Sequence, residues 1–542
     1  MTNAWPKHFY LIAASTALRG EQPSRETMGS KAYNLLRMAT MGLPVPPALV
    51  IGTHFTHAPG KALLPTFNLG LPALERASGL KFGDSRQPLI VSVRSRAAVS
   101  MPGMMETLLN IGLCENTLPG LLRQTGNPRL VWDAYRRLIA SYGETVAGLP
   151  AALFENELQQ ITQERDERLL DFSELRTLAR RFLKIYADAA STPFPQDARE
   201  QLAGAIRAVF ASWGADKAQE YRRLNAIDGT LGTAVTIQAM VFGNSGGHSG
   251  AGVGFTRDPT SGAAQLWIDF LANAQGEDVV SGRRNAHGHE TLASIAPAAW
   301  QALENAAQTI EREFADMQDF EFTVQDGVLH MLQTRTGKRT PLAAARIALD
   351  LLDAGVIDVV TAQERTQHLR DDDLGIQQLR TDAGPNTGNT PAQTLLGHAM
   401  TACPGVVSGE IALDAERAAA RSQAGAAIVL VRQDAETSDI AALQLAQGLL
   451  TQRGARTSHA AVVARQLGKV CLVGCEELRI DMAARVIKFG DRAFSEGEVI
   501  TLDGNAGAIH AGALAVVRVQ DEVLLQRLRA LREMAPLRKL GA

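Results

Sequence analysis

Residues 317–340 read MQDFEFTVQDGVLHMLQTRTGKRT, and they predict a β-hairpin. Two runs rich in apolar residues flank the dipeptide Asp326-Gly327, which favours a two-residue turn between antiparallel strands. Polar and apolar residues alternate within each run, a period that is typical of a strand with one buried face. The segment therefore predicts two antiparallel strands joined by a tight turn.

Four polar side chains are expected on this hairpin, at Asp319, Glu321, Gln333 and Arg335. The two on each strand are separated by a single residue, so each pair projects to one face. Carboxylates suit Mg²⁺, and an arginine suits a polyphosphate. The same alternation also fits a half-exposed hairpin face held by salt bridges, so the chemistry of these residues alone leaves both interpretations open.

The chain around the hairpin divides into four parts by composition and periodicity. Residues 1–340 combine strands with a mostly helical stretch at about 115–225, rich in Arg, Glu, Leu and Ala. Residues 341–394 contain a helix and then Gly-, Pro-, Asn- and Thr-rich text, which marks a linker. Residues 395–515 alternate short strands and short helices, as a compact α/β unit does. Residues 516–542 predict an amphipathic C-terminal helix.

The composition is that of an ordinary globular protein. Of the 542 residues, 46% are hydrophobic and 20% are charged, and the formal net charge of -3 argues against nucleic acid or an anionic membrane as a partner. No apolar run is long enough to span a bilayer, and the apolar N-terminal stretch is interpreted as a strand rather than a signal peptide. Of the four cysteines only Cys471 and Cys475 are close together, without zinc-site spacing and within an apolar run, which predicts that these two are buried thiols; a cytoplasmic location fits this.

His459 stands out among the eleven histidines because of its neighbours. The segment TQRGARTSHAAVVARQLG, residues 451–468, predicts a strand end, a turn and then a helix with Thr457 or Ser458 as its N-cap. His459 then falls in the first helical turn, where free backbone N–H groups and a partial positive charge stabilise a phosphoryl group. A neutral imidazole is also a competent nucleophile. The alternative is a histidine that merely begins a helix.

The segment TSHAAVVAR, residues 457–465, resembles the phosphohistidine signature of the pyruvate phosphate dikinase and phosphoenolpyruvate synthase family. The resemblance implies that His459 is the phosphate carrier. It also implies that Gly454, Thr457 and Ser458 support the phosphohistidine.

The N-terminal part resembles the nucleotide-binding region of the same family over most of residues 25–340. GSKAYNLLRMATMGLPVPP, which begins at Gly29, is similar to the family's opening, and the resemblance implies that Lys31 contacts nucleotide phosphates. VSVRSRAAVSMPGMMETLL, which begins at Val91, is similar to the family's phosphate-binding loop and implies the same for Arg94. The strand that carries Gln238 is expected to line the adenine pocket.

The resemblance also assigns the hairpin and a loop. It implies that Asp319, Glu321, Gln333 and Arg335 bind nucleotide, with Glu321 and Gln333 as metal ligands. It further implies a mobile loop over the phosphates, formed by Ser100, Met101, Pro102 and Gly103.

Two segments depart from the family pattern. Residues 95–100 read Ser-Arg-Ala-Ala-Val-Ser, where the family has Ser-Gly-Ala-Arg-Ala-Ser. Ala455 and Arg456 stand where the family has a second glycine and an apolar residue. The nucleophile is unaffected by either change.

The fold implied is α/β, of the α+β multidomain kind. It joins an ATP-grasp nucleotide-binding domain with a helical insertion to a small swivelling phosphohistidine β/α domain. The activity implied is an ATP-dependent phosphotransferase that uses Mg²⁺, phosphorylates His459 and releases AMP. After the phosphohistidine domain only one helix is expected, which leaves no room for the family's pyruvate-binding barrel of about 200 residues. The acceptor is then expected on a separate protein or to be a small molecule.

Two other functions stay open at this point. One is a non-catalytic ATP-binding paralogue with a regulatory role. The other is a stand-alone dikinase that acts on a small molecule other than pyruvate.

Overall fold

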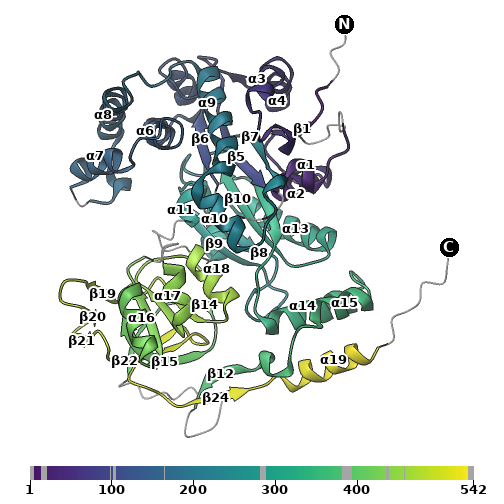
Figure 1. The fold of residues 1–542 in the computed structure, drawn as a ribbon, viewed down its shortest axis with the longest axis vertical. Helices are drawn as coiled ribbons and strands as arrows, with labels where there is room; N and C mark the ends of the chain where they lie inside the picture. The colour runs from purple at the N-terminus through teal and green to yellow at the C-terminus, as the bar shows by residue number, and fades with distance from the viewer. Residues whose placement is uncertain are drawn as a thin grey trace, which may run out of the picture. The chain divides into compact units, whose positions relative to one another are not determined.

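The computed structural model forms two compact units (Figure 1). Unit 1 comprises residues 1–247 and 329–334, and unit 2 comprises residues 248–328 and 335–542. The structure describes residues 5–13, 21–97, 99, 101, 105–163, 165–280, 288–380, 394–434, 439–456 and 458–534.

Unit 1 is built on a five-stranded antiparallel sheet with the order β1-β2-β7-β5-β6. Its strands are β1 (Phe9–Ile12), β2 (Ala48–Ile51), β5 (Val91–Ala97), β6 (Thr107–Ile111) and β7 (Thr233–Ala239). Before β5 lies the short strand β4 (Pro88–Leu89). The strands form because β-branched and aliphatic residues dominate them, and their side chains are almost all buried.

Helices of unit 1 include α2 (Ser30–Thr40) and a run of six between β6 and β7. That run consists of α5 (Leu118–Thr125), α6 (Pro128–Thr145), α7 (Ala152–Thr162), α8 (Phe172–Ala190), α9 (Ala198–Ala211) and α10 (Asp216–Leu224). The helical stretch predicted for residues 115–225 is therefore confirmed. Figure 1 shows α6, α7 and α8 grouped beside the sheet of this unit, and their aromatic and leucine side chains join its core.

The first part of unit 2 contains a sheet in which β8 (Gly250–Phe255) lies between β10 (Gln318–Gln325) and β9 (Trp267–Ala272). β10 leads into β11 (Val328–Thr336) through a two-residue turn in which Asp326 and Gly327 both have positive φ, 51° and 81°. The predicted tight turn is therefore confirmed. Helices α11 (Gly276–Val280), α12 (His289–Ile295) and α13 (Pro297–Phe314) accompany this sheet.

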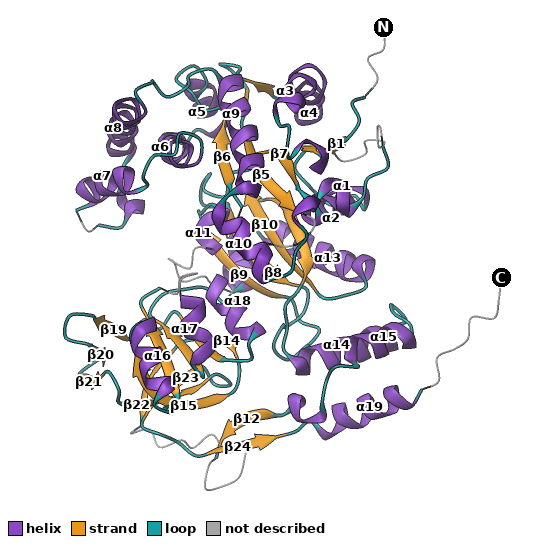
Figure 2. Ribbon diagram, viewed as in Figure 1, coloured by secondary structure: helices purple, strands orange, loops and turns teal. Residues whose placement is uncertain are grey.

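The predicted linker region and the C-terminal region come together in unit 2. Helices α14 (Pro341–Asp353), α15 (Val359–Thr366) and α19 (Glu522–Glu533) share one leucine-rich core, and Figure 2 shows them side by side. The C-terminal helix begins later than predicted, after its N-cap Asp521. Its expected start instead forms β24 (Val516–Val519), which pairs with β12 (Ile376–Leu379), because valine-rich segments favour strands.

The remainder of unit 2 is an eight-stranded mixed sheet with the order β13-β23-β22-β15-β16-β17-β18-β14. Its strands are β13 (Leu395–His398), β14 (Met400–Cys403), β15 (Val406–Ala412), β16 (Ile428–Arg432), β17 (Gly448–Thr451), β18 (Val470–Val473), β22 (Val499–Asp503) and β23 (Ala508–Ala511). Three helices accompany it, α16 (Ala415–Gln423), α17 (Ile440–Leu445) and α18 (His459–Gln466). The predicted α/β multidomain fold is confirmed.

All four cysteines are buried and free, and for Cys471 and Cys475 this burial was predicted. They are Cys114 in unit 1 and Cys403, Cys471 and Cys475 in unit 2. In the part of the chain that the structure describes, no helix combines the length and the apolar character needed to cross a membrane.

Candidate functional site

Arg94 and Gln238 share one face of the sheet of unit 1. Ser92 on β5 lies opposite Gln238 on β7, and Arg94 lies opposite Thr236. Opposite residues of antiparallel strands point to the same face, and so do residues two apart on one strand. The structure therefore brings these two predicted nucleotide-binding residues together, and it adds Thr236, whose place beside Arg94 the sequence did not indicate.

This face holds buried polar atoms without partners. Arg94 Nε and Thr236 Oγ1 are both buried and have no hydrogen-bond partner among the described residues. A buried polar group that lacks a partner costs about 1–3 kcal/mol. Gln238 differs, since its Nε2 donates to the Pro46 carbonyl oxygen at 3.2 Å. The face is thus suited to a ligand with hydrogen-bonding oxygens.

Lys31 and Gln333 also belong to unit 1. Lys31 is the second residue of α2, whose helix N-cap is Gly29 with φ of 76°. On the same helix, Asn34 Nδ2 donates to the Thr334 carbonyl oxygen at 3.0 Å. That bond ties the helix of Lys31 to the strand segment that contains the buried Gln333.

The predicted phosphate loop is described only at Met101. This side chain is 7% exposed and lies in an apolar cluster with Trp213 and Ala218. Ser100, Pro102 and Gly103 lie outside the described residues. Met101 therefore anchors one point of the loop through apolar packing.

Asp319 on β10 and Arg335 near the end of β11 form an ion pair in unit 2, in which the aspartate is buried and the arginine is partly exposed. Arg335 Nε and Nη2 each lie 2.8 Å from Oδ2 of Asp319. The Asp319 residue is 3% exposed, and its negative charge raises the pKa of the Arg335 guanidinium. Glu321 follows two residues later on β10 and is half-buried.

The strand register places the two carboxylates on one face of the β10-β8-β9 sheet. Asp319 lies opposite Phe255, which lies opposite Trp267 on β9. In the adjacent row, Glu321 lies opposite Val253, which lies opposite Asp269. Because the two rows are two residues apart, all six side chains belong to the same face.

The loop before His459 packs on this face. Arg456 Nε lies 2.9 Å from Oδ1 of Asp269, and Arg456 Nη2 donates to the Ile268 carbonyl oxygen at 2.7 Å. Its guanidinium carbon also lies 4.3 Å from the centre of the Trp267 ring. Asp269 is fully buried, so Arg456 supplies positive charge to a carboxylate that water does not reach.

Ala455 and Arg465 also contact residues of the β10-β8-β9 sheet. Ala455 is fully buried in an apolar cluster with Ala251, Val253, Leu271, Ala274 and Val279. Arg465 donates through Nε and Nη2 to the Ala402 carbonyl oxygen, at 3.1 and 2.9 Å, and its guanidinium carbon lies 5.1 Å from the Trp267 ring centre. Burial lowers the pKa of Arg465.

The helix start at His459 agrees with the sequence. Ser458 is the N-cap of α18 and its Oγ accepts from the Ala461 N–H at 3.4 Å, while His459 is the first helical residue. Gly454 has φ of 138°, which suits glycine. Thr457 and the His459 side chain lie outside what the structure describes.

The sequence did not indicate Asp269, nor the ion pair that Arg456 makes with it. A charged residue inside the apolar strand Leu266-Trp-Ile-Asp-Phe270 is a signal that could have indicated Asp269. Arg456 was expected as a donor near the start of the His459 helix and as a departure from a family pattern, but not as a partner of Asp269. Nothing local to either residue indicates its partner.

Comparisons with known proteins match two parts of the chain. Residues 73–290 match the family described as pyruvate phosphate dikinase, AMP/ATP-binding domain, and residues 425–507 match PEP-utilising enzyme, mobile domain. The chain therefore combines a nucleotide-binding domain with a mobile domain. The first part is similar to a domain of pyruvate phosphate dikinase, and the second is similar to a domain of PEP-utilising enzymes.

Curated relatives agree with the family matches. The chain is 40% identical over 504 residues to pyruvate, phosphate dikinase of Clostridium symbiosum, which covers 91% of this chain and 57% of the relative. It is 39% identical over 505 residues to the chloroplastic pyruvate, phosphate dikinase of Flaveria trinervia, covering 91% of this chain and 52% of the relative. The chain thus spans little more than half the length of these relatives.

Proposed function

We propose that this chain is an ATP-dependent phosphotransferase that forms a phosphohistidine at His459 and releases AMP. The observation that carries the proposal is the packing of Ala455 and Arg456 on the sheet face of Asp319 and Glu321, with Arg456 paired to Asp269. The segment that carries the nucleophile thereby lies on the face that carries the predicted phosphate- and metal-binding groups.

Arg335 would bind the nucleotide phosphates. Asp319 holds its guanidinium in place, so the side chain is oriented before ATP arrives. An arginine aimed at a phosphoryl group neutralises negative charge that moves to the leaving oxygen during transfer. Within unit 1, Arg94 is a separate proposed phosphate-binding residue, and its buried Nε has no hydrogen-bond partner among the described residues.

Mg²⁺ fits the donor types of the predicted ligands. It is usually bound through one or two carboxylates together with phosphate oxygens and water, so Glu321 would supply the carboxylate and Gln333 an amide oxygen. Among the described residues, no group of three or more His, Cys, Asp or Glu side chains is placed to hold a metal ion. When bound, Mg²⁺ would neutralise phosphate charge.

His459 would attack a phosphorus atom of ATP through a ring nitrogen. At the β-phosphorus, a nitrogen–phosphorus bond forms as the bond to the oxygen that bridges to the α-phosphate breaks, and AMP leaves with that oxygen and its electron pair. The γ-phosphoryl group of the resulting pyrophosphohistidine would then pass to water or to inorganic phosphate, which leaves the phosphohistidine. The start of α18, capped by Ser458, favours the negative charge of the phosphoryl group. The phosphoryl group would then pass to a separate protein or a small-molecule acceptor.

Incubation with ATP labelled at the β-phosphate tests the proposal. We expect alkali-stable, acid-labile label on the wild-type chain, formation of AMP, and no label on His459→Ala. His57→Ala, which removes an exposed histidine of unit 1, is the matched control and should be labelled as the wild type is. Equal labelling of His459→Ala and the wild type would refute the proposal.

A further inference from the structure

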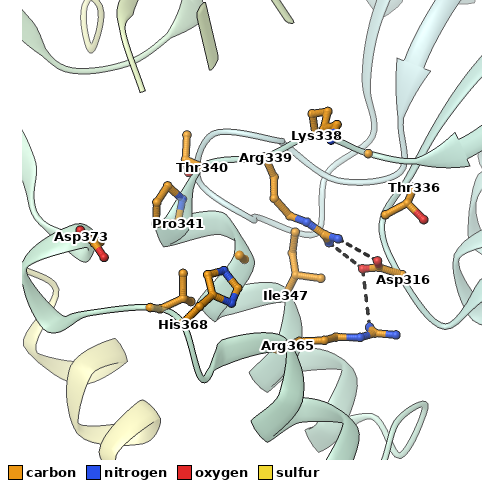
Figure 3. Close-up of a pocket in the computed structure, with 14 residues that line it drawn as sticks. Asp316, Thr336, Lys338, Arg339, Thr340, Pro341, Ile347, Arg365, His368 and Asp373 are labelled. Carbon is orange, nitrogen blue, oxygen red and sulfur yellow. Dashed lines mark hydrogen bonds and ion pairs between the residues drawn. The ribbon is translucent and has the colours of Figure 1, made fainter. Parts of the chain in front are cut away.

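A cavity of about 470 Å³ in unit 2 lies outside the site described above. It is lined by the segment that follows β11, residues 336–341, by side chains of α14 and α15, and by the residues just beyond α15 (Figure 3). Asp316, which precedes β10, closes one side. The cavity therefore lies at the open end of the hairpin that carries Asp319 and Arg335.

Basic side chains outnumber acidic ones around this cavity. The basic residues are Lys338, Arg339, Arg365 and His368, and the acidic residues are Asp316 and Asp373. Asp373 is already paired with Arg370, which does not line the cavity, because Arg370 Nη2 lies 3.2 Å from Asp373 Oδ1. The positive charge within the cavity is thus compensated mainly by Asp316.

Asp316 is shared between two arginines. Arg339 forms a two-pronged pair with it, with Nη1–Oδ1 of 2.6 Å and Nη2–Oδ2 of 2.7 Å. Arg365 Nη1 lies 3.6 Å from the same Oδ1, and Figure 3 shows both guanidiniums converging on the carboxylate. One carboxylate cannot neutralise two guanidiniums, so this buried group leaves an excess of positive charge.

Lys338 and His368 add uncommitted donors. Both are exposed, and neither has a hydrogen bond or an ion pair within the described ranges. The N-terminus of α14, with Thr340 as N-cap and Pro341 as its first residue, lies in the same lining and adds partial positive charge. The cavity thus combines net positive charge, free donors and enough volume for a small molecule.

We propose that this cavity binds a small phosphate-bearing anion. Lys338 and His368 would donate to the phosphoryl oxygens. The two guanidiniums that pair with Asp316 would supply the attractive positive charge. The proposal does not rest on the phosphotransfer function, because none of these residues belongs to the nucleotide or histidine site. Both inorganic phosphate and an organic phosphomonoester have the required chemistry.

Calorimetric titration of the full chain tests this site. The probes are inorganic phosphate and glycerol 3-phosphate, each added in the presence of a saturating non-hydrolysable ATP analogue so that nucleotide-site phosphate binding does not contribute. We expect Lys338→Ala/His368→Ala to bind at least tenfold more weakly than the wild type. Equal binding of the two probes would identify free phosphate as a sufficient ligand, and preference for the ester would identify an organic phosphate.

A matched control separates the cavity from general surface charge. Lys488→Ala/His398→Ala removes the same two side-chain types from exposed positions on β13 and β20 (Val486–Phe489), and it should bind as the wild type does. All four substituted positions are exposed, so the variants are expected to keep the wild-type melting temperature. Absence of binding to the wild type, or equal binding by the two double variants, would overturn the proposal.

Discussion

Asp319 and Asp269 are two buried aspartates of one sheet, yet they meet their arginines in different ways. Asp319 on β10 pairs with Arg335, which lies 16 positions further along and just across the hairpin turn. Asp269 on β9 pairs with Arg456, which is 187 positions away in the loop before His459. The first pair exists whenever the hairpin forms. The second exists only when that loop lies on the sheet.

The Asp319–Arg335 pair depends only on the folded hairpin, whereas the Asp269–Arg456 pair depends on the position of the loop before His459. Burying a carboxylate is costly unless a cation accompanies it, and removing one partner of a buried pair is strongly destabilising. For Asp319 the cost would fall on the hairpin itself. For Asp269 it would fall on the docked arrangement of the histidine loop, so the comparison can be tested by changing each arginine in turn.

Arg335→Ala should have the largest effect. It removes the proposed phosphate-binding group and leaves Asp319 without this partner, so labelling of the chain by ATP should slow by about 100-fold or more. The rate of label incorporation measures this, with Arg335→Lys as the variant that keeps a positive charge but not the planar fork. Labelling by Arg335→Ala at the wild-type rate would contradict a role for the hairpin pair.

Arg456→Met should have a smaller and more specific effect. The apolar side chain leaves Asp269 without this partner and weakens the docking of the loop, so labelling should fall about tenfold, which corresponds to about 1.4 kcal/mol. ATP affinity, measured by calorimetry, should stay at the wild-type value because Arg335 and Arg94 are untouched.

A second substitution sharpens this prediction. Asp269→Asn in the Arg456→Met background removes the buried negative charge that has lost Arg456, so part of the lost labelling should return. A double variant as slow as Arg456→Met, or slower, would show that the ion pair is not what holds the loop.

Ser458→Ala should lower the stability of the chain without changing any charge. The substitution removes the side chain that accepts from Ala461 N–H at the start of α18, and loss of an N-cap costs about 1 kcal/mol. The melting temperature should drop by about 2–4 °C. Ser458→Asp keeps a capping acceptor and should melt near the wild type; a similar drop in both variants would argue against the cap.

His330 should give the smallest effect, visible only as a pH dependence. Burial lowers its pKa below the ordinary value of 6.5, so the folded chain favours the neutral ring. Its contribution to stability is then present above pH 6.5 and is lost as the pH falls through the lower folded pKa. His330→Gln should lose less stability between pH 7 and pH 5 than the wild type does, by less than about 1 kcal/mol. Parallel melting curves for the two proteins would contradict this.

Local patterns predicted the hairpin, the helical stretch and the helix start at Ser458, because each depends on residues within a few positions of one another. Arg335 and Asp319 were predicted as neighbours for the same reason. Their roles toward nucleotide remain predictions.

Contacts between distant segments could not be predicted in the same way. Thr236 joins Arg94 only through the pairing of β5 with β7, and Asp269 joins Arg456 only through packing between segments far apart in sequence. At residues 516–519 the helical expectation was wrong, because pairing with β12 favoured a strand there. Pairing between segments far apart in sequence decides these contacts and this strand, and the periodicity of a single sequence does not indicate which segments pair.

Because the native cysteines are buried, thiol-reactive dyes can be directed to cysteines introduced on the surface of this chain. Thiolates are the reactive form, and burial raises the pKa of Cys403 to about 11 and that of Cys475 to about 12. A cysteine introduced at an exposed position such as Val516 would therefore react with a maleimide well ahead of the native thiols. Pairs of such labels would report distances between β9 and the histidine loop in solution, without first removing any natural cysteine.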